Sequence, residues 1–216
     1  MPRHPTPTAR RRRRRIGLLG GSFNPAHGGH RQLSLEALKR LGLDEVWWLV
    51  SPQNPLKPVA GMAPLAERLA EARQVAAHPR IRVSDVESRL GTRYTADTLA
   101  RLVQVRRDAA FVWLMGADNL VQISRWKDWR RIFATVPIAV FDRPSYSLGS
   151  LRAPAAQRFA RARRGVASAR RLALAAPPAW IFVPMRLNPT SATAIRAARQ
   201  RAAGLGPAST ETGAPL

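Results

Sequence analysis

The 216-residue chain contains no cysteine, which excludes disulfides, cysteine nucleophiles and thiolate metal sites. It also has no apolar run of membrane-spanning length, so we expect no membrane segment. Acidic residues are scarce: 13 Asp and Glu stand against 36 Lys and Arg, giving a formal net charge of +23. This charge predicts attraction to polyphosphates and non-specific RNA or DNA contact at low salt, without establishing a nucleic-acid function.

The N-terminal segment is basic and has no hydrophobic periodicity. An unbroken arginine run extends from Arg10 to Arg15, and we expect residues 1–15 to form a disordered basic arm. The alternatives are a solvated tail, a mis-assigned start codon, and an arm that contacts nucleic acid. The apolar run that follows is too short for the core of a secretory signal, so we expect a cytoplasmic location.

A glycine-rich string follows the short apolar run 16–19 and leads into an amphipathic segment. It reads Gly20-Gly21-Ser22-Phe23-Asn24-Pro25-Ala26-His27-Gly28-Gly29-His30. The order predicts a strand, a turn and a helix. We expect the two glycines to permit a positive φ or a close approach of the backbone to a ligand, which suits phosphate.

Two histidines stand three residues apart where this helix is expected to start. We expect the helix to begin near Pro25 or Ala26, with Asn24 as its N-cap. His27 and His30 would then share one face at the positive end of the helix dipole, where a triphosphate can bind. Taken singly, these features also fit an ordinary turn, a polar helix start or a partial metal site.

The complete string resembles the signature of the mononucleotide adenylyltransferases in the His-x-Gly-His nucleotidyltransferase superfamily. A second string, residues 190–196, resembles that family's Ser-Ser-Thr-x-Ile-Arg signature, which grips the ATP phosphates. Ala192 replaces one serine, a change worth about 0.5–1.5 kcal/mol if the hydroxyl is used. The resemblance covers roughly residues 16–200 and is strongest to the bacterial nicotinate-nucleotide adenylyltransferases.

The resemblance also implies site residues. It assigns catalysis to His27, His30 and Arg196. It assigns ATP binding to Gly20, Gly21, Ser22, Phe23, Lys57, Ser191, Thr193 and Arg196; Asp118 is added because an acid at the carboxyl end of a central strand can accept hydrogen bonds from a ribose or help position a metal. It assigns substrate binding to Ser22, Tyr94, Thr95, Trp126 and Arg143. Local alternatives remain: Lys57 as a solvated loop residue, Thr95 as a helix N-cap, and Asp118 as the N-cap of a short helix.

The rest of the chain alternates between expected strands and helices. We expect strands at 45–50, 81–83, 110–115, 136–141 and 180–184, with helices at 64–77, after Thr95, and as a basic helix over 151–176. This alternation predicts one α/β domain over residues 16–203, built on a doubly wound parallel sheet, and a disordered tail over 204–216. The site is then expected at the carboxyl ends of the strands.

The implied reaction is the transfer of AMP from ATP to nicotinate mononucleotide, giving deamido-NAD and pyrophosphate. It needs no side-chain nucleophile, and we expect Mg²⁺ to be carried by the ATP phosphates rather than by a protein site. The alternatives are nicotinamide mononucleotide or another small molecule as acceptor, or a basic RNA- or DNA-binding module with a nucleotide-binding fold. The sequence leaves the oligomeric state open.

Overall fold

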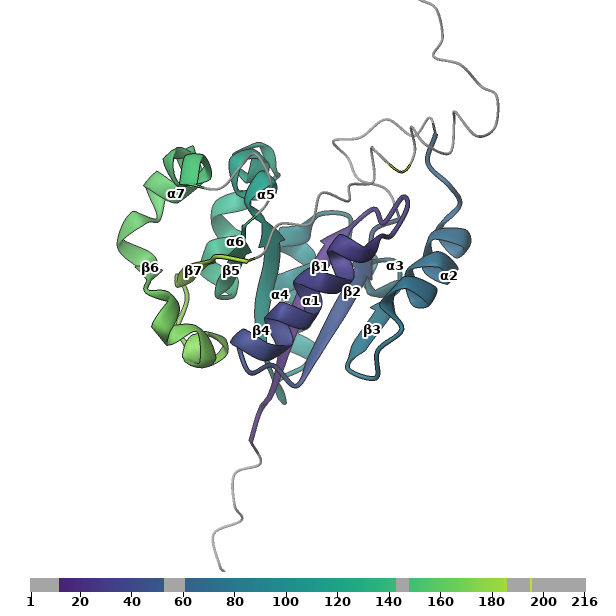
Figure 1. The fold of residues 1–216 in the computed structure, drawn as a ribbon, viewed down its shortest axis with the longest axis horizontal. Helices are drawn as coiled ribbons and strands as arrows, with labels where there is room; N and C mark the ends of the chain where they lie inside the picture. The colour runs from purple at the N-terminus through teal and green to yellow at the C-terminus, as the bar shows by residue number, and fades with distance from the viewer. Residues whose placement is uncertain (1–11, 53–60, 143–147, 186–194, 196–216) are drawn as a thin grey trace, which may run out of the picture.

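Seven parallel strands form the centre of the molecule, in the order β3-β2-β1-β4-β5-β7-β6 (Figure 1). The structure is a computed structural model, and it describes residues 12–52, 61–142, 148–185 and 195. The strands are β1 Arg14–Gly21, β2 Glu45–Val50, β3 Ile81–Ser84, β4 Ala109–Gly116, β5 Ile138–Phe141, β6 Arg163–Arg164 and β7 Trp180–Val183. The predicted α/β fold with a parallel sheet is confirmed.

The strand order reverses between β1 and β4. The chain begins at β1, adds β2 and β3 on one side, and then crosses back so that β4 pairs with the other edge of β1. In a doubly wound sheet the carboxyl ends of the strands at such a reversal form a ligand-binding crevice. The ends of β1 and β4 therefore mark the expected site.

Helices cover both faces of the sheet and bury two hydrophobic clusters. One cluster contains α1 Gly28–Arg40, α2 Leu65–Ala76 and the 3₁₀ segment η4 Val166–Leu174. The other contains α3 Val86–Leu90, α4 Thr95–Val105, α5 Ala117–Gln122, η1 Ile123–Arg125, α6 Trp129–Thr135 and α7 Pro154–Arg158. In Figure 1, α1 lies in front of the sheet and α4 behind it. Among the described helices, none has the length and apolar character needed to cross a bilayer.

The start of β1 differs from the expected disordered arm over residues 1–15. Arg14 and Arg15 pair with Ala109 and Ala110 of β4, so the strand begins two residues earlier than the expected domain boundary. Arg12 forms an ion pair with Asp44 at 2.7 Å. This part of the arginine run is ordered because strand pairing and nearby carboxylates satisfy its backbone and its charge. Residues 1–11 lie outside the described residues.

The basic helix expected over 151–176 is absent. The described chain forms η2 Leu148–Arg152, α7, η3 Ala160–Ala162, β6 and η4 instead. Arg163 and Arg164 pair with Trp180 and Ile181 of β7, which requires an extended backbone in the middle of the expected helix. The pairing of β6 with β7 at the edge of the sheet outweighs the helical propensity of this segment.

Gly20 is required by side-chain packing, not by the positive φ that the sequence suggested. Gly20 and Gly21 continue the ladder of β1 with Leu49 and Val50, and neither has a positive φ. A Cβ added at Gly20 would lie 2.4 Å from Cη2 of the buried Trp113 indole. The two glycines therefore have different roles, because a Cβ at Gly21 would meet only Phe23, at 3.5 Å.

We expect Gly20→Ala to lower the free energy of unfolding by about 1–3 kcal/mol, because the added methyl overpacks the core against Trp113. Urea denaturation of the purified variant measures this change. Gly21→Ala is the matched control and should cost much less. Equal destabilisation by the two substitutions would contradict the assigned role of Trp113.

Candidate functional site

The backbone takes an unusual conformation immediately after β1. Phe23 has φ +46°, in the left-handed region that residues other than glycine rarely adopt, at a cost of roughly 1–3 kcal/mol. Its ring is buried and stacked on Trp48, with centroids 5.0 Å apart. Packing of the ring thus holds the strained backbone, and such strain is concentrated at functional sites.

The first helix starts at Gly28 with His27 as its N-cap, so the expected start near Pro25 with Asn24 as cap was wrong. The Asn24 side chain instead donates to the carbonyl of Gly61 and accepts from the N–H of Ala63, at 3.0 and 3.3 Å. Its hydrogen-bonding groups are used to join the turn to the segment before α2. The backbone therefore stays non-helical through residue 27.

The two histidines form a reciprocal capping box. His27 Nδ1 accepts the N–H of Gly29, and His30 Nδ1 accepts the N–H of His27, both at 3.2 Å. The ring centroids lie 3.9 Å apart. An Nδ1 that accepts a hydrogen bond is unprotonated, so each neutral imidazole carries its proton on Nε2. The structure therefore places two oriented Nε2–H donors at the N-terminus of α1, an arrangement suited to anionic oxygens.

A second group of expected residues lies at the start of α4. The N-cap is Tyr94, so Thr95 is the first helical residue and not the cap. The ammonium group of Lys127 lies 4.5 Å from the centroid of the Tyr94 ring, and Arg131 forms an ion pair with Asp97 at 2.9 Å. These contacts bring the segment that contains Trp126 next to Tyr94 and Thr95, as a shared pocket requires.

Asp118 follows the carboxyl end of β4. It is the second residue of α5, whose N-cap is Gly116, so the capping alternative for Asp118 was wrong. Trp126 follows η1 and is partly buried against the same hydrophobic cluster as α5. Asp118 and Trp126 therefore both lie in the segment that follows β4, next to the point where the strand order reverses.

Glu87 is a buried carboxyl group that sequence reasoning missed. It lies in α3 with only 5% of its surface exposed, and its Oε1 lies 3.5 Å from the Thr98 hydroxyl of α4. Burial raises the pKa of Glu87 to about 7, against the opposing effect of hydrogen bonds from Ser51 and Thr98. A lone glutamate in a short polar segment gives no signal of burial, because the packing of α3 against α4 and β2 removes it from water.

Five of the expected site residues lie outside the described residues, namely Lys57, Arg143, Ser191, Thr193 and Arg196. The assignment of Arg196 to the same catalytic site as His30 therefore stays a prediction. Among the residues that the structure does describe, no three His, Asp or Glu side chains are grouped to hold a metal ion.

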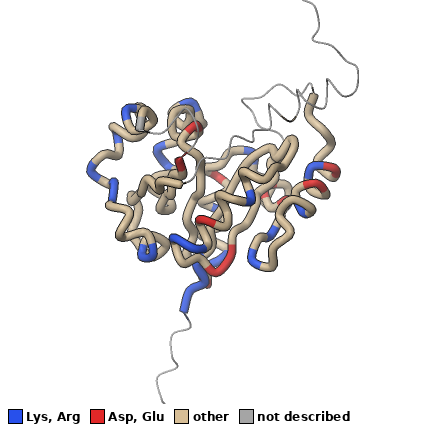
Figure 2. The backbone as a smooth tube through the Cα atoms, in the orientation of Figure 1, with Lys and Arg blue, Asp and Glu red and all other residues tan. Residues whose placement is uncertain are grey.

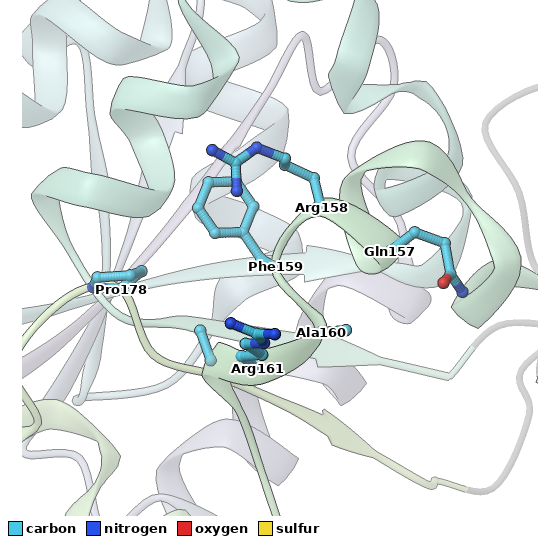
Figure 3. Close-up of a pocket in the computed structure, with 7 residues that line it drawn as sticks. Gln157, Arg158, Phe159, Ala160, Arg161 and Pro178 are labelled. Atoms are coloured by element: carbon cyan, nitrogen blue, oxygen red, sulfur yellow. The ribbon is translucent and has the colours of Figure 1, made fainter.

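A surface hollow with a volume of about 530 Å³ lies away from this site (Figure 3). It is lined by residues 157–162 and by Pro178, shortly before β7 begins. The Arg158 guanidinium stacks on Phe159, 5.6 Å from the ring centroid. The site residues instead follow strand ends, so this hollow is separate from the expected crevice.

Comparisons with known proteins agree with this arrangement. Residues 18–198 match the family described as cytidylyltransferase-like. The chain is 57% identical to a probable nicotinate-nucleotide adenylyltransferase of Cereibacter sphaeroides over 84% of this chain and 96% of that protein. It is also 57% identical to one from Bradyrhizobium over 84% of this chain and 95% of that protein. Its fold resembles that of Plasmodium falciparum nicotinic acid mononucleotide adenylyltransferase complexed with NaAD. That match has a TM-score of 0.65 at 14% identity and covers 85% and 83% of the two chains.

We expect Glu87→Gln to flatten the pH dependence of stability. The raised pKa means that the contribution of Glu87 to stability is fully present below about pH 4.5 and is lost as the pH rises through about 7, by about 3 kcal/mol. The glutamine variant has no carboxyl to ionise and should gain relative stability in that window. Urea denaturation across the pH range measures the difference, with the exposed Glu67→Gln as control; parallel wild-type and Glu87→Gln profiles would contradict it.

Proposed function

The chain belongs to the cytidylyltransferase-like family, among the nicotinate-nucleotide adenylyltransferases, and from this premise we propose its reaction and the role of each site residue. The protein is a nucleotidyltransferase that transfers AMP from ATP to nicotinate mononucleotide in NAD biosynthesis. Both substrates are intracellular nucleotides, so we place the reaction in the cytoplasm.

In the proposed chemistry, a phosphate oxygen of nicotinate mononucleotide attacks the α-phosphorus of ATP. A new phosphorus–oxygen bond forms, the bond from the α-phosphorus to the bridging oxygen breaks, and pyrophosphate leaves with that electron pair. The attacking oxygen is already ionised at neutral pH, so no side-chain nucleophile is needed. The protein has to align the two phosphates and stabilise the charge that moves onto the leaving group.

The capping geometry of the two histidines is the observation that carries this proposal. Because both Nδ1 atoms accept backbone N–H groups, the proton of each neutral ring lies on Nε2, and an Nε2–H group is a donor suited to anionic oxygens. We assign His27 and His30 to the triphosphate, together with the turn from Gly20 to Phe23. Donors that are fixed before the reaction stabilise developing charge without reorganising.

The remaining ATP contacts are assigned to Asp118, Lys57, Ser191, Thr193 and Arg196. Asp118 follows β4 at the reversal of strand order, where a carboxylate can accept hydrogen bonds from a ribose. The other four residues lie outside the described residues, and their assignment follows from the family signatures. Arg196 would add a fixed positive charge near the leaving pyrophosphate.

An ATP-using nucleotidyltransferase of this kind needs a divalent metal, and we propose Mg²⁺. The described residues offer no cluster of three metal-ligating side chains, whereas ATP supplies oxygen ligands of the kind that Mg²⁺ prefers. When bound, the metal neutralises negative charge on the phosphates. The residues of the chain then orient the triphosphate and do not need to enclose the ion.

For the mononucleotide we assign Tyr94, Thr95, Trp126, Arg143 and, shared with ATP, Ser22. The N-terminus of α4 presents backbone N–H groups and the positive end of its dipole, which suits the carboxylate of nicotinate. Trp126 offers an aromatic face for the pyridine ring. A carboxylate accepts at both oxygens, whereas an amide presents a donor to one of these N–H groups, so the site should favour the acid.

We expect His27→Asn to lower kcat by about 100-fold or more while leaving the KM for ATP nearly unchanged, because the lost donor acts mainly in the transition state. Asparagine is a good N-cap, so this variant preserves the start of α1 and isolates the imidazole. Steady-state kinetics with a thermal unfolding check makes the measurement. His27→Ala, which also removes the cap, should show the same loss of kcat with an additional drop in stability. A near-normal kcat in His27→Asn would remove His27 from the chemistry.

Product analysis with the acid and amide mononucleotides tests the substrate. We expect kcat/KM to be at least about tenfold higher with nicotinate mononucleotide than with nicotinamide mononucleotide, because the amide places a donor against the N–H groups of α4. Chromatographic detection of deamido-NAD and NAD quantifies the two reactions. Comparable values would overturn the preference for the acid.

A further inference from the structure

Arg68 of α2 is a buried arginine that the site assignments leave unused. Only 2% of the residue is exposed, and its guanidinium donates hydrogen bonds to four backbone carbonyls. These carbonyls belong to three separate segments: Ser22 after β1, Ser51 and Pro52 after β2, and Ala63 before α2, at 2.7, 2.7, 2.9 and 2.8 Å. Within the described chain, no carboxylate forms an ion pair with Arg68.

Joining segments of a fold through a buried arginine that has no carboxylate partner costs free energy. Desolvation of the charge has to be offset by hydrogen bonds, and an apolar side chain of similar length usually stabilises a core at least as well. Burial lowers the pKa of Arg68, yet an arginine remains protonated at neutral pH. The arrangement therefore keeps a full positive charge beneath the turn that follows β1.

The bond from Arg68 to Ser22 fixes the direction of the next peptide group. The Ser22–Phe23 peptide is trans, so its C=O and N–H point in opposite directions. With the Ser22 carbonyl held against Arg68, the N–H of Phe23 must point away from α2. A cationic donor on the carbonyl also polarises the peptide and strengthens its N–H as a donor.

Phe23 is also the residue with the left-handed backbone, at φ +46°. Its ring is anchored on Trp48 on one side of the peptide, and the preceding carbonyl is anchored on Arg68. These two anchors determine the orientation of this peptide group, which a flexible glycine turn would leave free.

We propose that Arg68 is a positioning residue for the ATP site, holding the Ser22–Phe23 peptide so that the N–H of Phe23 faces the triphosphate. The inference rests on the proposed function. Arg68 acts through the peptide and does not touch the nucleotide. Its hydrogen bonds to the carbonyls of Ser51 and Pro52 also fix the position of the segment after β2 relative to this peptide.

The test compares Arg68→Met, which removes the charge and all donors, with Arg68→Lys, which keeps a charge but not the planar set of donors. Arg73→Met is the matched control, because Arg73 lies on the same helix and is exposed. KM for ATP, KM for nicotinate mononucleotide and kcat are measured below the melting temperature of each variant. Calorimetry gives the ATP affinity independently of turnover.

We expect the KM and Kd for ATP to rise by roughly tenfold or more in Arg68→Met, and by less in Arg68→Lys, with a smaller change in the KM for the mononucleotide. Arg73→Met should match the wild type. If Arg68→Met does not fold, the ATP affinity of Arg68→Lys tests the proposal instead. An unchanged ATP affinity in the folded variants, with only stability or kcat reduced, would assign Arg68 a purely structural role and overturn the proposal.

A wild-type protein that makes no deamido-NAD would count against the proposed function, while the calorimetric affinities would still decide the role of Arg68.

Discussion

The structure depends on how the backbone is held where it leaves β1. That strand lies between β2 and β4 in the middle of the sheet, so the peptide groups that follow it are enclosed and need partners within the protein. The carbonyl of Ser22 is satisfied by Arg68, and the side chain of Asn24 joins the turn to the segment before α2. Because the Ser22 carbonyl is directed toward Arg68, the N–H of Phe23 in the same trans peptide points the opposite way, and the proposed phosphate contact depends on this orientation.

The histidines cap the first helix with one ring nitrogen, and the proposed contact with phosphate uses the other. Each uses Nδ1 to cap α1, which fixes the orientation of the ring and leaves the proton on Nε2. The few acidic residues also have local uses. Asp44 and Glu45 pair with Arg12, Arg14 and Arg82 at the amino end of β2, which orders the last part of the arginine run. By contrast, the chain from α7 to η4 carries basic positions and no acidic ones (Figure 2), including the wall of the hollow in Figure 3.

The sequence was most informative where one local signal sufficed. Apolar runs predicted β2 and β4 closely, and the alternation of strands and helices predicted the parallel sheet. Local signals were wrong where tertiary contacts competed with them. Asn24 is a good N-cap by composition but bonds to residues 61–63, and the alanine-rich segment 151–176 is interrupted because β6 pairs with β7.

The sequence by itself determined the fold class, the family resemblance and the identity of the two histidines, because each rests on residues that are close along the chain. Only the tertiary structure decided which atoms of those histidines cap α1, why Gly20 has no side chain, and where Arg68 and Glu87 lie. Arg68 and Glu87 are polar residues in unremarkable segments. They become buried only when distant segments pack around them, and such burial follows from long-range packing that no local pattern encodes.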